Sequence, residues 1–319
     1  MPIRVPAILT VLAVAAQLTA ACQEAAPRTG PVPPRAAGAT PTAAPGTARP
    51  SAKARPVRRP KAPAGMTVGY AMYDRAARRM TIQHHAHRRF RSASVVKILI
   101  ALDYLAAHRA GTEIPASDRA LLRSMLRSSD DDAATTLWTR GGRVRVIERM
   151  VAALRLTDTA PPPAGKPGFW GYTAISAADV VRIYRYLLDP AHRRSGDFIM
   201  GHLRRATRCA ADGFDQYVGI PAALPRPWAI KQGWSGYGSV PPRRCVRVST
   251  SLHAPGRRAA PVVDLVRPVL HTTGTVGPGD HMIVVVLSLQ PAGSRWGASA
   301  ARLTAFTKAV YRAGGGRTR

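Results

Sequence analysis

Strand-like segments lie near both ends of residues 65–319 of this 319-residue chain, and helical patterns fill the stretch between them. Alternation of apolar and polar residues indicates the strands. They span Thr67–Tyr73, Arg79–His84, Trp228–Trp234, Cys245–His253 and His281–Leu289. This order predicts a single α+β domain, whose antiparallel sheet takes strands from both chain ends and carries flanking helices and an inserted helical subdomain.

The middle of the chain carries apolar residues at helical spacing. The predicted helices span residues 94–109, 117–127, 132–139, 144–154, 176–188 and 195–209, and a last one covers 299–311. Ser176 and Asp179 have the spacing of a capping box. Thr157–Tyr172 is rich in Pro and Gly and is expected to form a structured loop. Ala254–Gly279 is expected to be an irregular surface excursion between two strands.

Residues 1–21 have the layout of a secretory signal peptide. Arg4 precedes an apolar run that is short for a membrane span, and small residues lead up to Cys22. The residues before Cys22 resemble a bacterial lipobox, in which the cysteine is lipidated after cleavage. We therefore expect an exported protein, held by a lipid at Cys22 on the extracytoplasmic face of the cell membrane. Plain secretion is the alternative.

Residues 22–64 form a linker of Ala, Pro, Thr, Gly and scattered Arg, with no apolar face to bury. Five basic residues lie between Lys53 and Lys61, and the whole chain has a formal net charge of +30. For an exported chain this charge favours an anionic cell-wall polymer or a membrane surface as a partner. The alternative is that the tract only reflects the high Arg content of the chain. Nothing in the sequence indicates a nucleic-acid-binding fold.

Two cysteines, Cys209 and Cys245, remain once Cys22 is assigned to lipidation. Outside the cytoplasm such a pair is expected to form a disulfide. A group of histidines, His84, His85 and His87, has no adjacent acidic or cysteine ligand, and the strand pattern places His84 on the other face. We therefore expect no metal and no cofactor.

Ser94 and Lys97 open a long apolar helix and stand one helical turn apart. In this arrangement a neutral lysine amine can take the proton of the serine hydroxyl and make it a nucleophile. The helix N-terminus also favours developing negative charge. The alternative is a capping serine followed by an ordinary helical lysine. Only Lys97 of the six lysines has a serine three residues earlier, which favours the catalytic interpretation.

Two further motifs follow in order: Ser129-Asp130-Asp131 before a helix, and Lys231-Gln232-Gly233 on a strand. Together with Ser94-x-x-Lys97, they resemble the S-x-x-K, S-D-N and K-[ST]-G motifs of the class A β-lactamases and penicillin-binding proteins. The resemblance covers nearly all of residues 66–319. It implies a β-lactamase/transpeptidase-like fold and acyl-enzyme chemistry on β-lactams or on D-alanyl stem peptides of peptidoglycan.

The resemblance also implies roles for the residues that match the motifs. Ser94 would be the nucleophile and Lys97 the amine that activates it. Ser129 would pass a proton to the departing nitrogen. Lys231 would polarise Ser129 and help to hold the substrate carboxylate.

The strand that carries Lys231 would also bind the substrate. Gly233 and its neighbours would run beside it as a strand edge. The backbone N–H of Ser94, with that of Trp234 or Ser235, would form the oxyanion hole. Arg243, Arg244 and Arg247 are the alternatives for a contact to the substrate carboxylate.

The sequence departs from the family pattern at three places. Asp131 replaces the asparagine and puts a carboxylate near Lys97, which favours the charged form of a lysine. Gln232 replaces Thr or Ser, whose hydroxyl contacts the substrate carboxylate; an amide could donate there with a different reach. The loop Thr157–Tyr172 has no Glu to activate water, and its one acid, Asp158, is expected to be a turn or cap residue.

We therefore expect a serine hydrolase whose acyl-enzyme at Ser94 persists. A catalytically decayed envelope-binding lipoprotein of the same fold is the main alternative, and a β-lactamase with an unrecognised deacylation base is the third.

Overall fold

The computed structural model describes residues 59–108, 112–166, 168–245 and 264–317. The signal peptide, Cys22 and most of the linker lie outside these ranges, so their assignments stay predictions. Among the helices within the ranges, none is both long and apolar enough to cross a membrane.

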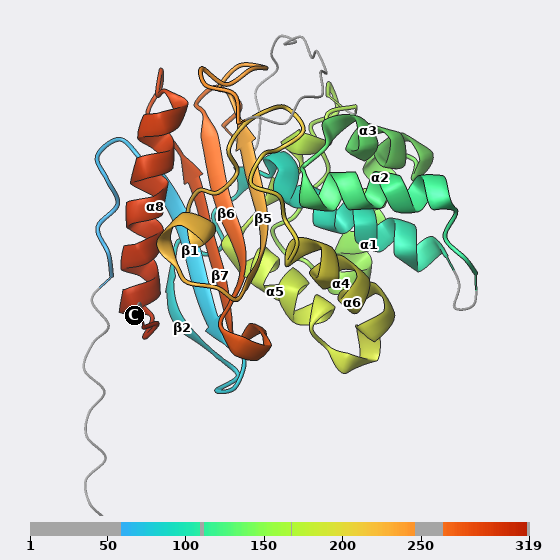
Figure 1. Ribbon diagram of the computed structural model, residues 1–319, viewed down its shortest axis with the longest axis horizontal. Coiled ribbons are helices and arrows are strands. Elements are labelled where there is room, and N and C mark those ends of the chain that lie inside the picture. The colour runs from blue at the N-terminus through green and yellow to red at the C-terminus, as the bar shows by residue number, and fades with distance from the viewer. Residues whose placement is uncertain (1–58, 109–111, 167, 246–263, 318–319) are drawn as a thin grey trace, which may run out of the picture. The chain divides into compact units, whose positions relative to one another are not determined.

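A five-stranded antiparallel sheet forms the centre of the fold (Figure 1). Its order is β2-β1-β7-β6-β5, so the first strands of the domain pair with the last. The strands are β1 (Thr67–Asp74), β2 (Arg79–His84), β5 (Trp228–Ser235), β6 (Val269–Val276) and β7 (Met282–Leu289). A second, two-stranded sheet joins β3 (Phe90–Arg91) to β4 (Ala174–Ile175). The predicted α+β class and the sheet built from both chain ends are confirmed.

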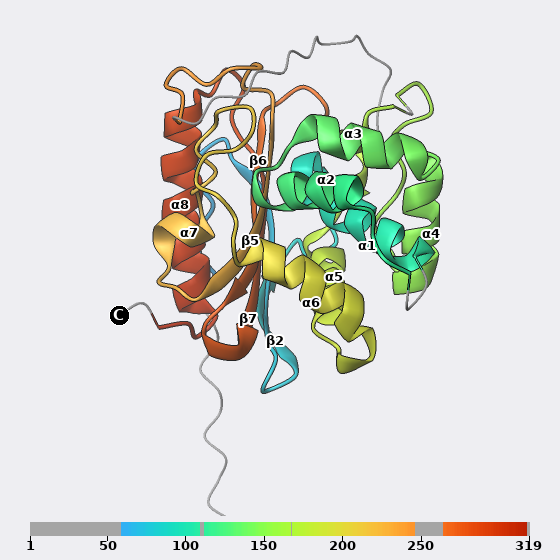
Figure 2. The same cartoon turned by 45° about the vertical axis from the view of Figure 1, so that its right-hand side comes forward.

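Helices cover both faces of the sheet, as the two views show (Figures 1 and 2). α8 (Trp296–Ala313) packs on one face against β6 and β7. The helical subdomain covers the other face, where its helix of residues 177–187 contacts β1 and β7. The helices other than α8 are α1 (Lys97–Ala107), α2 (Ala116–Arg127), α3 (Asp131–Arg140), α4 (Val144–Leu154), α5 (Ala177–Leu187), α6 (Arg193–Leu203) and α7 (Ile220–Ala223). Two apolar cores result, one on each side of the sheet.

The structure corrects the expectation of an irregular excursion at 254–279, because β6 is a fully buried strand within it. Its sequence misleads because His271, Thr272 and Thr273 are polar yet buried. Each finds a partner inside the fold: Thr273 Oγ1 donates to Lys231 O at 2.6 Å, and Thr272 Oγ1 accepts from Ile220 N at 3.0 Å. Of the predicted strand 245–253, Cys245 is not in a strand, and the rest lies outside the described ranges.

Most predicted helices agree with the structure within a few residues, but the helix predicted for 195–209 ends at Leu203. The helix ends there because the segment from Thr207 onward forms hydrogen bonds with the end of α2 and not with the preceding helical turn. Thr207 N donates to Arg127 O at 3.0 Å. Ser176 caps α5 as predicted, accepting from Asp179 N. The Asp179 carboxylate does not complete a capping box; it accepts from the backbone N–H groups of residues 157–159 and so holds the start of the loop.

His271 should make the free energy of unfolding depend on pH. Its ring is buried, Nδ1 accepts from Ser288 N at 3.1 Å, and Nε2 lies 2.9 Å from Arg91 O. Burial lowers its pKa from 6.5 to about 4. Between pH 6.5 and pH 4 the unfolded chain therefore binds a proton at His271 that the folded chain does not bind. The contribution of His271 to the free energy of unfolding is fully present above pH 6.5 and is lost as the pH falls toward 4. This group alone contributes about 3 kcal/mol to that loss.

Denaturant unfolding at pH 7.5 and pH 4 measures this contribution. His271→Gln keeps one acceptor and one donor but cannot titrate, so its free energy of unfolding should fall by about 3 kcal/mol less than that of the wild type over this range. His281→Gln, at an exposed position, is the matched control and should behave as the wild type. Equal pH dependence in His271→Gln and the wild type would contradict the assignment.

Candidate active site

Ser94 lies in a 3-10 turn, Ala93–Val96, that leads directly into α1. Its side chain is buried, with 5% of the residue exposed. Ala93 just before it has φ of 44°, in the left-handed region that an L-residue rarely adopts. Such strain persists only where the surrounding structure imposes it, and it is concentrated at functional sites. The turn thus fixes Ser94 at the N-terminal end of a buried helix.

Lys97 lies at the start of α1 and is completely buried. Its Nζ is 2.5 Å from Asp131 Oδ1 and donates to Ser129 O at 2.6 Å, with Ser129 Oγ at 3.4 Å. The contacts resolved in the described ranges include no hydrogen bond between Ser94 Oγ and Lys97 Nζ. The predicted closeness of Asp131 to Lys97 is therefore found, and the amine is turned toward the Ser129 motif.

Ser129 and Lys231 meet although 102 residues separate them in sequence. Lys231 Nζ donates to Ser129 Oγ at 2.8 Å and to Gln232 O at 3.0 Å. Burial lowers the pKa of Lys231 well below its usual value, the charge of Lys97 adds to this, and Asp131 opposes it. Ser129 has φ of 56°, so a second strained residue lies at the same place. The two lysines therefore converge on one serine hydroxyl.

β5 passes directly beside the turn that carries Ser94, and Gly233 is the residue that permits this. A Cβ at Gly233 would lie 2.9 Å from Ser92 O and 3.2 Å from Ser94 N. The backbone of β5 therefore runs against the backbone N–H of Ser94. Trp234 and Ser235 follow on the same strand, and the oxyanion-hole role of one of their N–H groups stays a prediction.

The Gln232 side chain differs from expectation, because it points away from the Lys231 side of β5. It is fully buried, and its Nε2 donates to Val218 O at 2.5 Å and to Gln216 O at 3.2 Å. Successive residues of a strand face opposite sides, and Lys231 takes the side that carries Ser129. The Gln232 amide is thus engaged in the core and does not donate into the site.

The loop 157–172 brings an aromatic ring to the site. Trp170 lies with its ring centroid 4.7 Å from Lys97 Nζ, and its Nε1 donates to Thr135 Oγ1 at 3.1 Å. Asp158 is held elsewhere: its Oδ2 accepts from Ser176 Oγ at 2.7 Å and is 2.8 Å from His87 Nδ1. The loop therefore covers Lys97 with Trp170, while its one carboxylate serves a structural contact.

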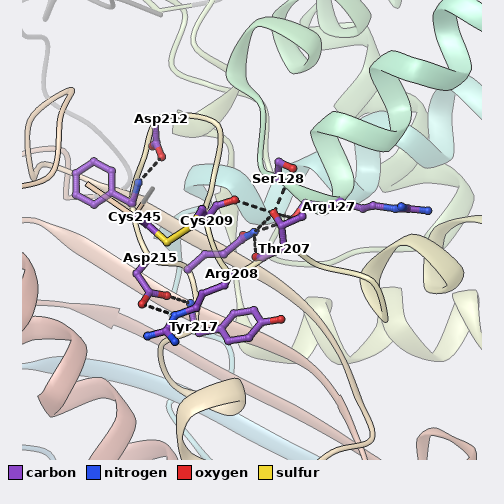
Figure 3. The surroundings of a disulfide bond; sticks show 11 residues. Arg127, Ser128, Thr207, Arg208, Cys209, Asp212, Asp215, Tyr217 and Cys245 are labelled. Carbon is purple, nitrogen blue, oxygen red and sulfur yellow. Dashed lines mark hydrogen bonds and ion pairs between the residues drawn. A yellow bond between two sulfur atoms is a disulfide. The ribbon is translucent and has the colours of Figure 1, made fainter. Parts of the chain in front are cut away.

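The predicted Cys209–Cys245 disulfide is present (Figure 3). It holds a loop that contains Asp212, a residue that the sequence analysis missed. Asp212 Oδ2 accepts from Trp234 Nε1 at 3.0 Å, and Oδ1 accepts from Phe214 N at 3.1 Å. Burial raises the pKa of Asp212, and the negative charge of Asp131 acts in the same direction. No motif marks Asp212 in the sequence; its one signal is its place three residues after a bridged cysteine.

Two of the three candidate arginines, Arg243 and Arg244, show no contact with the site in the described ranges. Arg243 and Arg244 have exposed side chains, and Arg247 lies outside those ranges. Another arginine, Arg91 of β3, extends its side chain to the end of β5. Its Nη2 atom is 3.5 Å from the position that a Cβ of Gly236 would take. Its guanidinium is buried and donates to Asp264 O and Arg267 O.

Solved structures share this fold. A class A β-lactamase from Mycobacterium abscessus matches with a TM-score of 0.54 at 19% identity, over 79% of this chain and 95% of that one. A mutant of PBP-A, solved as an acyl-enzyme complex with penicillin G, matches with a TM-score of 0.53 at 15% identity, over 78% and 90%. The chain therefore has the β-lactamase and penicillin-binding-protein fold, as its three motifs predict.

One relative is similar in sequence as well. The "Putative lipoprotein LppW" of Mycobacterium tuberculosis is 33% identical over 235 residues, or 72% of this chain. The match spans 65% of the length of that relative. No model of a known protein family matches the chain.

Proposed function

We propose that the protein is a serine acyl-enzyme that reacts through Ser94 with β-lactams or with D-alanyl peptide amides. One observation carries the proposal: Ser94 follows the strained Ala93 at the start of a buried helix and lies beside β5, the strand whose Lys231 meets Lys97 at Ser129. Two buried lysines around one serine hydroxyl cost desolvation energy, and such arrangements occur where their chemistry is used.

The residues supply each part of an acyl transfer. Ser94 Oγ attacks the carbonyl carbon, and its proton passes to Lys97 in the neutral form. The N–H groups of Ser94 and of the strand after Gly233 stabilise the oxyanion. As the carbon–nitrogen bond breaks, Ser129 donates its proton to the departing nitrogen and regains one from the lysine pair. The acyl group then remains on Ser94 as an ester.

Hydrolysis of this ester is expected to be slow. A fast step needs a base that activates water near the ester, and no acid of the loop 157–172 contacts Lys97 or Ser94 within the described ranges. Trp170 lies over Lys97, and Asp158 is bonded to Ser176. An aromatic ring cannot accept the proton of an attacking water. The acyl-enzyme should therefore accumulate.

The proposal includes a location at the cell envelope. It is supported by the signal-peptide layout, by the lipobox-like residues before Cys22 and by a relative whose name is "Putative lipoprotein LppW". Peptidoglycan stem peptides would be the substrate at that location, and the charge of +30 would favour contact with an anionic wall polymer or membrane surface.

Intact mass of the full chain during incubation with benzylpenicillin tests the chemistry. A long-lived adduct that Ser94→Ala lacks is the expected result, and Ser117→Ala, at an exposed serine of α2, should retain it. A transient adduct with consumption of the drug would show that the acyl-enzyme is hydrolysed, and the protein would then be a β-lactamase. Full reaction in Ser94→Ala would refute the assignment of the nucleophile.

The second candidate function is a binding protein for envelope ligands whose catalytic site has decayed. The Lys97–Asp131 contact of 2.5 Å favours it, because a lysine held in an ion pair is a poor base. Absence of any adduct, with the folded structure intact by circular dichroism, would select this function.

A further inference from the structure

A cavity of about 410 Å³, the α2–α6 cavity, lies between α2 and α6 and shares no residue with the candidate active site. Its volume is in the range of pockets that bind small molecules. Its charged lining consists of four arginines and one carboxylate: Arg119, Arg123, Arg127, Arg205 and Asp197. Arg119 has one exposed partner, Glu113, at 3.4 Å. The lining is therefore strongly positive at neutral pH.

The three arginines of α2 lie on one face of that helix. Arg119, Arg123 and Arg127 are spaced four residues apart, and side chains at this spacing are neighbours on a helix surface. Like charges at this spacing destabilise a helix. Asp118, the acid of α2, does not offset them, because it is paired with Arg140. The face of α2 toward the cavity therefore concentrates positive charge at a cost in stability.

Arg127 is half-buried and is held by a histidine of α6. Its Nε donates to His202 Nδ1 at 3.0 Å, so the neutral ring carries its own proton on Nε2. Burial lowers the pKa of His202 to about 4, and the charges of Arg127, Arg205 and Arg123 act in the same direction. The ring is therefore neutral at neutral pH. It fixes the Arg127 guanidinium in place without neutralising its charge.

The chain offers little acid to compensate this cluster. Within the described ranges, no ion pair joins an acidic side chain to Arg123, Arg127 or Arg205, and Asp197 pairs with none of them although it lines the same cavity. Among the residues outside those ranges, the sequence has a single acidic side chain, Glu24. An anion that enters the cavity from outside would therefore relieve the repulsion among the arginines.

The remaining lining of the cavity is apolar. It includes Phe198, whose ring centroid is 4.7 Å from that of His202, and the small side chains of Ala116 and Ala120. A water molecule takes up about 30 Å³ of liquid, so the cavity is larger than one phosphate group needs. It has room for a neutral organic group beside the anion.

We propose that the α2–α6 cavity binds a phosphate ester, with the phosphate among the arginines and its neutral organic group against Phe198. The guanidinium fork matches phosphate oxygens in bidentate geometry. A multiply charged anion also offsets several clustered cations better than a single carboxylate does. The proposal uses no group of the candidate active site and does not depend on acyl-enzyme chemistry. The ester would come from a soluble or wall-polymer phosphate or from a lipid head group.

Calorimetric titration of the full chain with glycerol 3-phosphate, at pH 7.5 and low ionic strength, tests the site. We expect a Kd below about 1 mM, no binding of glycerol, and weaker binding of the ester as salt is added. Arg123→Gln should weaken binding about tenfold, the effect of one hydrogen bond to a charged group. Asp197→Asn removes the carboxylate of the cavity and should strengthen binding about threefold.

Arg145→Gln is the matched control. It removes an exposed arginine of α4 that does not line the cavity, and it should bind glycerol 3-phosphate as the wild type does. Thermal unfolding without ligand checks that each variant is folded. Arg123→Gln should be no less stable than the wild type, because one of the mutually repelling charges is gone.

Vesicles of phosphatidylglycerol in phosphatidylcholine separate the two sources. A loss in Arg123→Gln for glycerol 3-phosphate alone supports a soluble or wall-polymer ester, a loss for the vesicles alone supports a lipid head group, and a loss for both supports the site with either source. If Arg123→Gln and Arg145→Gln behave alike with both probes, the proposal is overturned. Any binding would then come from the general attraction of a chain with a net charge of +30.

Discussion

Replacement of Lys97 by methionine is expected to slow acylation of Ser94 by about a thousandfold, within the range that general-base catalysis contributes. Methionine fills much of the buried volume of the lysine side chain but cannot take a proton. The variant also removes the donor to Ser129 O and frees Asp131 from its ion pair. Single-turnover mass measurement with benzylpenicillin gives the rate constant directly.

A matched control separates catalysis from loss of a lysine charge. Lys308→Met changes an exposed lysine of α8 on the other face of the sheet and should react as the wild type. Lys97→Met combined with Asp131→Asn removes the unpaired carboxylate; it should restore thermal stability without restoring the rate. A Lys97→Met protein that acylates within threefold of the wild type would show that another group activates Ser94.

Loss of the Cys209–Cys245 disulfide is expected to lower the free energy of unfolding by about 4 kcal/mol. The bridge joins residues 36 apart, and a closed loop of this length restricts the unfolded chain by about that amount. The bridged loop also braces the segment before Ser129, since Ala211 N donates to Ser128 O at 2.7 Å. Denaturant unfolding of Cys209→Ser/Cys245→Ser against the oxidised wild type measures the loss.

The wild type under reducing conditions is the internal control, because it keeps both side chains and loses only the bond. It should lose the same stability as the double variant. Two free thiols at Cys209 and Cys245 in the protein purified without reductant, counted by mass after alkylation, would contradict the bridge. A loss below 1 kcal/mol would mean that the loop 207–216 is held by its other hydrogen bonds, such as Gln216 Nε2 to Arg127 O at 2.8 Å.

The sequence was informative about the fold wherever a strand or helix has one apolar face. β2 and α4 lie where predicted, because alternation or helical spacing is visible in them. β6 escaped prediction because its polar side chains are satisfied by residues distant in sequence, such as Ile220 and Tyr184. Buried polar strands of this kind have no local signal.

The motif residues of the site were predictable because each motif is short and local. That the motifs meet in space could be expected only from the resemblance to the family, whose motifs occur in the same order. In the structure, Lys231 Nζ donates a hydrogen bond to Ser129 Oγ. Asp212 and Trp170 could not be predicted, since each reaches the site through a loop whose path depends on tertiary contacts. The orientation of Gln232 also differed, because the register of β5 decides which side chains face the site.

The pairing of β1 with β7 has a consequence for the order of events during synthesis. Thr67 in the first strand lies opposite Leu289 in the last, so the hairpin β1–β2 has no further strand to pair with until more than two hundred further residues have been made. Ser94 leaves the ribosome early and Lys231 much later. A nascent chain therefore carries Ser94 before Lys231 can meet Ser129, so the site that we propose is incomplete until β5 has been made.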